Sequence, residues 1–205
     1  RAMLDPVLAE QPSRLPTLEW QLVLISDRPG VGIVNTALEE IGATTGRFRL
    51  IIELKTVRIN AALGINNAGT PPVGPLQSYF ATGFNSSFFS GDSLGVNFST
   101  VPDATRELRF GRLLYDTPVG VNGVRVGATA SYSETWPGDD RRQLATNIKS
   151  NSFELRASID PLQTRKSALR LTVAADYSDV SERDMLGTTY RDHIRTVDLR
   201  ADYRL

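Results

Sequence analysis

The chain has 205 residues, and its 23 Lys and Arg residues balance its 23 Asp and Glu residues, so the formal net charge at pH 7 is zero. A balanced charge excludes the basic surface that nucleic-acid-binding domains carry, and we expect no nucleic-acid partner. Because cysteine is absent, disulfides, thiolate metal sites and a cysteine nucleophile are excluded. Hydrophobic residues make up 40% of the chain, a share typical of an ordered protein.

No apolar run approaches the ~18 residues of a transmembrane helix, and the longest are short stretches such as Leu22 to Ile25. A transmembrane β-barrel stays open, because its signature is segments of ~10 residues in which apolar and polar side chains alternate. The chain begins at Arg1, with no initiator Met and no signal peptide. We therefore interpret it as a piece of a longer protein.

Residues 1–56 differ from the rest of the chain. Residues 3–10 predict a short helical segment, and Thr17 is a plausible N-cap for a helix over 18–26. The pattern leaves 22–25 open between helix and buried strand. Two strands are predicted at the end of this region, over 32–38 and 48–55, with a turn around 42–46. A helix and a hairpin are too small to be a whole domain.

From Val57 onward, apolar and polar side chains alternate in repeated segments, which predicts antiparallel strands with one apolar and one polar face. We expect eight strands, at 57–66, 76–84, 93–99, 107–111, 124–133, 153–159, 169–177 and 196–205. In the fourth, Leu108 and Phe110 form the predicted apolar face, Arg109 lies on the polar face, and Arg112 interrupts the apolar face.

The predicted connections also alternate in kind. Short turns are expected at 85–92, 117–123 and 160–167. On the other side we expect the connections 67–75 and 101–105 and two longer polar loops, 134–149 and 178–192. Short turns at one end and longer loops at the other are typical of outer-membrane barrels. Tyr132, Tyr177 and Tyr203 lie near the ends of predicted apolar faces, where amphipathic rings anchor at the level of lipid headgroups.

Five sequence pieces occur in a characteristic order. They are Leu24-Ile25-Ser26-Asp27-Arg28-Pro29-Gly30-Val31, Asn66-Asn67-Ala68-Gly69, Val73-Gly74-Pro75, Gly91-Asp92, and Leu114-Tyr115-Asp116-Thr117-Pro118. Together they resemble the outer-membrane transporters of two-partner secretion, the haemolysin-activator and haemagglutinin-secretion family. The order and spacing of these pieces match that family along nearly the whole chain.

The resemblance implies a fold and a location. Residues 1–56 would be the C-terminal part of a periplasmic polypeptide-transport-associated (POTRA) domain, an α+β unit in which 18–28 is the second helix. Residues 57–205 would be the N-terminal half, about eight strands, of a monomeric transmembrane antiparallel β-barrel in outer-membrane lipid. The family's first periplasmic domain, plug helix and remaining strands are absent from this sequence.

The resemblance also implies a function without enzyme activity, cofactor or metal: secretion of a large polypeptide partner, an adhesin or a haemolysin. The polar-face residues expected to line the pore are Arg58, Asn60, Arg109, Arg125, Glu154, Arg156, Arg170, Asp176, Asp198 and Arg200. The periplasmic residues expected to bind the partner, by strand addition and an apolar groove, are Leu22, Ile25, Val34, Phe48, Leu50 and Ile52.

Four motifs have a simpler interpretation than catalysis or ligand binding. Gly91-Asp92-Ser93-Leu94-Gly95 fits the G-x-S-x-G pattern of hydrolases, but a strand is predicted where the nucleophile elbow needs a helix. His193 beside Asp192 is expected to be a solvated side chain at a loop-to-strand junction. Gly30-Val31-Gly32 is interpreted as a turn, and Asp139-Asp140 as a loop neutralised by Arg141-Arg142 rather than a calcium site.

Two alternatives to two-partner secretion remain. A related outer-membrane protein-assembly factor would show the same strands, and a soluble all-β binding module would show the same alternation with its polar face in water. The two barrel proteins differ in the number of periplasmic domains and in whether a large secreted partner is encoded nearby.

Overall fold

The computed structural model describes residues 2–42, 46–164 and 167–205. Two helices open the chain, and a two-stranded antiparallel sheet follows them. Their bounds are Asp5–Ala9 for α1, Leu15–Ser26 for α2, Val31–Glu40 for β1 and Phe48–Thr56 for β2, with a short 3-10 turn, η1, at Ala2–Leu4. The helical segments and both strands predicted for this region are confirmed.

Helix α2 begins three residues before the predicted start. Pro16 lies in its first turn, where a missing backbone N–H costs nothing, and the N-cap is Arg14. Thr17 is not the cap; its hydroxyl donates to Glu10 Oε1 at 2.9 Å. The predicted turn around 42–46 falls largely outside the described residues.

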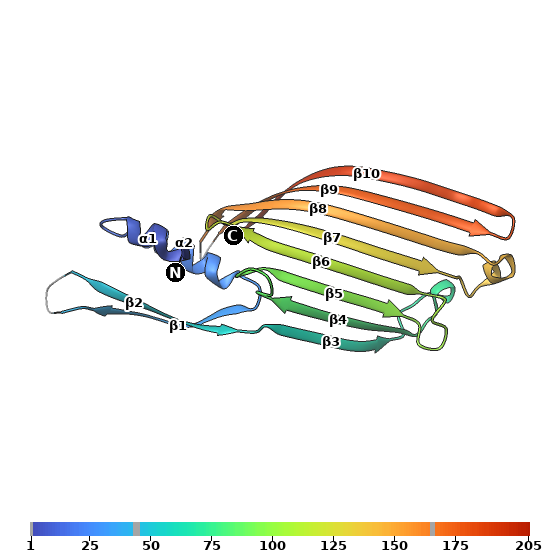
Figure 1. Ribbon diagram of the computed structural model, residues 1–205, viewed down its shortest axis with the longest axis horizontal. Helices are drawn as coiled ribbons and strands as arrows, with labels where there is room; N and C mark the ends of the chain where they lie inside the picture. Colours follow the sequence, from blue (N-terminus) through green and yellow to red (C-terminus); the bar gives the residue numbers. More distant parts are fainter. Residues whose placement is uncertain (1, 43–45, 165–166) are drawn as a thin grey trace.

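Eight antiparallel strands form the second sheet, as predicted, in the order β10-β9-β8-β7-β6-β5-β4-β3. The strands are Ile59–Asn66 (β3), Gln77–Asn85 (β4), Ser93–Thr100 (β5), Arg109–Val119 (β6), Val124–Thr135 (β7), Asn147–Gln163 (β8), Ala168–Asp184 (β9) and Gly187–Arg204 (β10). Each strand pairs with its neighbours in sequence, so β3 and β10 are the two edges and the sheet is not closed. Figure 1 shows it as one curved layer, with the helices and the β1-β2 hairpin at one end.

The connections between the strands lie at two opposite ends of the sheet. The turns 86–92 and 120–123 lie at the end that carries α2, together with Thr164 and Ser167 between β8 and β9, and we call this end the turn rim (Figure 1). The loops 67–76, 101–108 and 136–146 lie at the other end, the loop rim, together with the turn 185–186. Two short 3-10 turns lie in these loops, at Pro71–Val73 (η2) and Asp140–Leu144 (η3).

One predicted loop is wrong. Residues 178–192 were expected to be a long polar connection, but β9 continues to Asp184 and β10 begins at Gly187. The polar residues of this segment belong to a hairpin, in which Asp192 pairs with Val180 and His193 with Asp179. The alternation in hydrophobicity ends near Tyr177 because the paired strands continue with polar side chains on both faces.

The registers give the sheet two chemically distinct faces. We call one the apolar face; across the paired strands it carries Leu63, Phe80, Phe98, Leu113, Ala130, Phe153, Tyr177 and Arg195. The other, the polar face, carries Ala62, Ala81, Asn97, Arg112, Ser131, Ser152 and Ser178. Apolar side chains on the first face are exposed, up to 78% for Leu63 and 85% for Leu199.

The described residues lack the hydrophobic core that a water-soluble protein of this size has. The buried hydrophobic side chains in this part of the chain are Val7, Leu24 and Val101, and none of them lies within the eight strands. Large contiguous apolar surfaces on a folded protein mark an interface with another protein or a membrane. The apolar side chains of this sheet therefore face outward and need a partner surface.

Candidate functional site: the polar face and the turn rim

Most of the predicted pore-lining residues share the polar face. The strand register places eight of them on this face, in β3 and in the four strands from β7 to β10. They are Asn60, Arg125, Glu154, Arg156, Arg170, Asp176, Asp198 and Arg200. Arg58 precedes β3, and its carbonyl accepts a hydrogen bond from the backbone N–H of Asn85 at 2.7 Å.

Arg109 lies on the other face. It pairs with Glu134, and the next pair on the same face is Gly111 with Tyr132. Residues 107–111 were therefore assigned one position out of phase, because Leu108 precedes the strand and Phe110 is on the polar face. Arg112 does not interrupt the apolar face; it lies on the polar face opposite Asn97 and Ser131.

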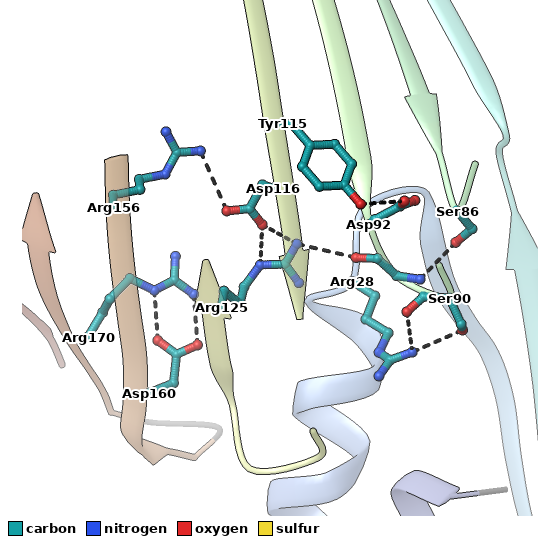
Figure 2. Close-up of polar contacts among 11 residues, drawn as sticks. Arg28, Ser86, Ser90, Asp92, Tyr115, Asp116, Arg125, Arg156, Asp160 and Arg170 are labelled. Atoms are coloured by element: carbon teal, nitrogen blue, oxygen red, sulfur yellow. Dashed lines mark hydrogen bonds and ion pairs between the residues drawn. The ribbon is translucent and has the colours of Figure 1, made fainter. Parts of the chain in front are cut away.

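Four strands contribute to a network of paired charges on the polar face (Figure 2). Arg125 donates to the carboxylate of Asp116, and Arg156 Nη2 lies 3.5 Å from the other oxygen of Asp116. Arg156 also contacts Glu154 at 2.8 Å. Nearer the turn rim, Arg170 binds both oxygens of Asp160, at 2.7 and 3.0 Å. Each arginine here has an acidic partner, so the face is charged without a large net field.

The turn 86–92 connects this network to the N-terminal segment. Arg125 Nη2 donates to the carbonyl of Gly91 at 3.2 Å, and Arg28 Nη1 donates to the carbonyl and hydroxyl of Ser90 at 3.2 and 3.1 Å (Figure 2). Gly91 has φ +86°, a conformation in which a Cβ is strained, and a Cβ there would lie 3.0 Å from Arg28. The turn is thus bound by one arginine from the sheet and one from the segment after α2.

Asp92 fixes the shape of that turn. Its side chain is 0% exposed, and its carboxylate accepts hydrogen bonds from the backbone N–H groups of Ser87, Phe88 and Phe89 at 2.7 to 3.0 Å. Burial alone would raise the pKa of Asp92, but these N–H donors and the Tyr115 hydroxyl outweigh it and hold the pKa below its usual range. Phe88 and Phe89, in the same turn, are 67% and 66% exposed.

The N-terminal segment contacts the turn rim at three more points. The carbonyl of Gly30 accepts from Val57 N–H at 2.8 Å, and a Cβ on Gly30 would lie 2.2 Å from the Val57 carbonyl. Gln163 donates to the carboxylate of Asp27. Leu24, buried, lies beside the position that a Cβ on Gly123 would occupy, 3.3 Å away. The pieces Leu24 to Val31, Gly91-Asp92 and Leu114 to Pro118, far apart in sequence, therefore meet at one rim.

The predicted partner-binding residues lie on α2 and the hairpin. Leu22 and Ile25 are half-buried on α2, and Leu50 and Ile52 are half-buried on β2. Phe48 shares their face of β2 and is exposed. Val34 is exposed at a register shift between Ile33 and Asn35, so it is opposite no residue of β2. Within the described residues β1 and β2 pair only with each other, which leaves each with an outer edge for strand addition.

The structure separates the residues that a hydrolase would bring together. Ser93 starts β5, a strand rather than a helix, and lies on the polar face opposite Asp116. His193 lies within β10 on the apolar face, not at a loop junction, and its Nδ1 is 3.4 Å from Asp179 Oδ1. A nucleophile and a base on opposite faces of a sheet cannot exchange a proton.

The remaining motifs have structural roles. Gly30, with φ +70°, ends the segment after α2, and a strand follows it. Asp139 caps η3, and the bidentate hydrogen bond from Arg141 lowers the pKa of Asp139 below its usual range. Among the described residues, no three His, Asp or Glu side chains gather as a metal site.

Asp116, Asp92, Arg28 and Asp160 were missed as members of the site. Asp116 has the same parity as Arg112 in β6, so a correct assignment of Arg112 to the polar face would have found it. Arg28, Asp92 and Asp160 lie in or beside turns, where the period of two ends and gives no information about orientation.

Within the described residues, no helix combines the length and apolar character needed to cross a membrane.

Comparison with known proteins gives two similar folds. No protein-family model matches the sequence, and no curated protein matches it. A structure of CdiB from Acinetobacter baumannii has a TM-score of 0.64 and 16% identity, and the match covers 93% of this chain and 37% of that one. A crystal structure of BamA from Haemophilus ducreyi lacking POTRA domains 1-3 has a TM-score of 0.51 and 14% identity, covering 90% and 36%.

This chain thus spans little more than a third of each similar structure. Coverage of 93% reaches beyond the eight-stranded sheet into residues 1–56. The fold predicted from the five sequence pieces is confirmed, because the chain shares its fold with parts of these two structures. In this chain the N-terminal segment contacts the turn rim through Arg28, Asp27 and Gly30.

Proposed function

We propose that this chain is part of an outer-membrane pore that secretes a large polypeptide partner in two-partner secretion. The observation that carries the proposal is the opposition of the two faces. Exposed aliphatic and aromatic side chains cover one face, as lipid requires, and paired charges of both signs cover the other. A lumen with both signs of charge hydrates an unfolded polar chain without holding it at one site.

The location follows from the same opposition. The apolar face would contact outer-membrane lipid, and the polar face would line part of a lumen that the remaining strands complete. Residues 1–56 would lie in the periplasm as part of a POTRA domain, below the turn rim. This role requires neither enzyme activity nor a bound cofactor, and we propose that the protein is not an enzyme. The likeness to CdiB, which includes part of residues 1–56, supports this arrangement.

A soluble all-β module is a poorer account of the sheet. In water, the polar face would be solvated and the apolar face would have to bury itself in a core. The described part of the sheet instead exposes Leu63, Leu155, Val197 and Leu199 on one face.

An outer-membrane protein-assembly factor is the second candidate, and the likeness to BamA favours it. The two functions differ in their client. A secretion pore serves one large exported protein, whereas an assembly factor serves many outer-membrane proteins.

Export of the partner encoded beside this protein tests the proposal. In the full-length protein, Phe48→Ser with Leu50→Ser removes two apolar side chains from the face proposed to bind the partner. Arg49→Ser with Ile51→Ser is the matched control, because these residues alternate with the first pair along β2. We expect partner export to fall about tenfold in the first variant and less than twofold in the control, for a loss of roughly 1.4 kcal/mol in binding.

The same cultures distinguish the two candidates. Loss of one exported protein with unchanged levels of other outer-membrane proteins supports the secretion pore. A general decline of outer-membrane proteins would contradict it and support the assembly factor. Unchanged export in both variants would remove the hairpin face from the proposal.

A further inference from the structure

On the apolar face, the side chains become more polar toward the loop rim, row by row across the strands. Across β8, β9 and β10 the register aligns Ile159-Leu171-Ala201, Ala157-Val173-Leu199, Leu155-Ala175-Val197, Phe153-Tyr177-Arg195, Asn151-Asp179-His193 and Lys149-Ser181-Arg191. The first three rows are aliphatic, the fourth is aromatic with one cation, and the last two are polar and charged. The series matches the order of chemistry met on leaving a bilayer, from acyl chains through the headgroup level to water.

The aromatic row marks the headgroup level. Arg195 lies over the ring of Tyr177, with Cζ 5.9 Å from the ring centroid. Arginine and tyrosine both place an apolar body at the edge of the acyl chains and a polar tip in the headgroups. The rows beyond Tyr177 are therefore level with lipid phosphate.

Basic side chains exceed acidic ones at and beyond that level on this face of the described sheet. The basic residues are Arg109, Lys149, Arg183, Arg191 and Arg195, and the acidic residues are Glu134 and Asp179. Three ion pairs join them: Arg109 with Glu134 at 3.8 Å, Lys149 with Glu134 at 3.4 Å and Arg191 with Asp179 at 4.0 Å. The basic side chains in these pairs are 48 to 60% exposed, whereas Glu134 is 14% and Asp179 26% exposed. Ion pairs whose cation is this exposed contribute only about 0–1 kcal/mol, so the phosphate of a lipid headgroup competes with the carboxylates for these cations.

We propose that Lys149, Ser181 and Arg191 form a binding site for the phosphate of an anionic lipid headgroup in the leaflet at the loop rim. Lys149 and Arg191 flank Ser181 from the two neighbouring strands, so their backbones lie roughly 10 Å apart. Both side chains are long enough to converge on one phosphate, and the Ser181 hydroxyl lies between them as a further donor. The continuous aliphatic rows below would contact the acyl chains of the same lipid.

This inference rests on the proposed function, because it assumes that the apolar face contacts lipid. Its occupant is a membrane lipid and not free phosphate, since the cations continue an apolar surface rather than line a closed pocket. The turn 86–92 offers a contrast, because its exposed side chains Phe88 and Phe89 are aromatic instead of basic.

Binding of lipid A to the full-length protein in neutral-lipid nanodiscs tests the site. The wild type is compared with Lys149→Gln/Arg191→Gln and with Arg14→Gln/Arg49→Gln, a control that removes the same charge from the N-terminal segment. Each cation near a lipid surface contributes about 1 kcal/mol, and the existing pairs offset part of it, so we expect about tenfold weaker binding in the first variant. The control is expected to stay within twofold, and Lys149→Arg should bind as the wild type.

Three results would overturn the site. These are equal binding of dephosphorylated lipid A, unchanged binding by Lys149→Gln/Arg191→Gln, or full displacement of lipid A by inorganic phosphate at equal concentration, which would mean that the ligand is free phosphate. A protein that inserts into nanodiscs but gives one of these results retains the proposed function. A protein that does not enter nanodiscs at all would contradict the proposed function itself.

Discussion

The hydroxyl of Tyr115 on β6 donates a 3.1 Å hydrogen bond to Asp92 Oδ2, which ties the turn 86–92 to a neighbouring strand. Phe88, in the same turn, meets the Tyr115 ring edge-on at 6.0 Å between centroids. Because Asp92 also accepts three backbone N–H groups, one carboxylate determines where the turn lies relative to the sheet.

Replacing Asp92 should loosen the turn rim. Asp92→Ala leaves the backbone N–H groups of Ser87, Phe88 and Phe89 without their charged acceptor, and we expect a loss on the order of 3 kcal/mol in unfolding free energy. Tyr115→Phe removes one hydrogen bond and keeps the ring contact, so its cost should be about 1 kcal/mol. Thermal unfolding of the folded form, followed by its gel mobility, measures both. Equal stability of Asp92→Ala and wild type would show that the turn is held by other contacts.

The depressed pKa of Asp92 gives the turn rim an acid sensitivity. A carboxyl whose folded pKa lies below its unfolded value contributes stability that is fully present above the unfolded pKa. That contribution is lost as the pH falls below about 4, the ordinary Asp value, and through the folded pKa. Asp92→Asn has no such proton to bind, so its unfolding temperature should fall less steeply with acid than that of the wild type. Parallel acid profiles of the two proteins would contradict the assignment.

The polar-face network should show coupled energetics. Asp116 is shared by Arg125 and Arg156, so Asp116→Asn leaves two cations without their common partner. We expect Asp116→Asn and Arg125→Gln each to cost about 1–2 kcal/mol. The double variant should cost about 1 kcal/mol less than their sum, because contacting pairs are not additive. Additive costs in chemical unfolding would mean that the pair contributes no coupling energy.

The two faces should respond oppositely to charge. Leu155→Arg places a cation on the apolar face of β8, whereas Ser152→Arg places one on the polar face of the same strand. A lipid-facing arginine costs about 2–4 kcal/mol at the bilayer midplane, so Leu155→Arg should reduce folding into lipid vesicles strongly. Ser152→Arg should fold nearly as well as the wild type. Similar folding yields for the two variants would contradict the assignment of the faces.

The period of two predicted the number of strands and the composition of most faces, because each face of this sheet carries mainly one kind of side chain. It failed where that condition ends. In β6 a single apolar residue before the strand, Leu108, displaced the phase by one and placed Arg109 on the wrong face. In β9 and β10 the pattern stopped at Tyr177, although the pairing continues to Asp184.

The turn-rim contacts could not be predicted from pattern. Arg28 and Ser90 are 62 positions apart in sequence, and Gln163 and Asp27 are 136 apart. These contacts depend on how α2 lies against the sheet, which no local periodicity records. The resemblance marked the relevant pieces in sequence, and the structure added that three of them are neighbours in space.

Water accessibility of alternate residues in intact outer membranes tests most directly the proposal that the sheet spans the membrane. The chain contains no cysteine, so single cysteines can be introduced at Ala130 and Ala157 on the apolar face, and at Ser131 and Ser158 on the polar face. A charged, water-soluble maleimide should label the cysteines at 131 and 158 and leave those at 130 and 157 unlabelled until detergent is added. Equal labelling of all four cysteines before detergent is added would contradict the account.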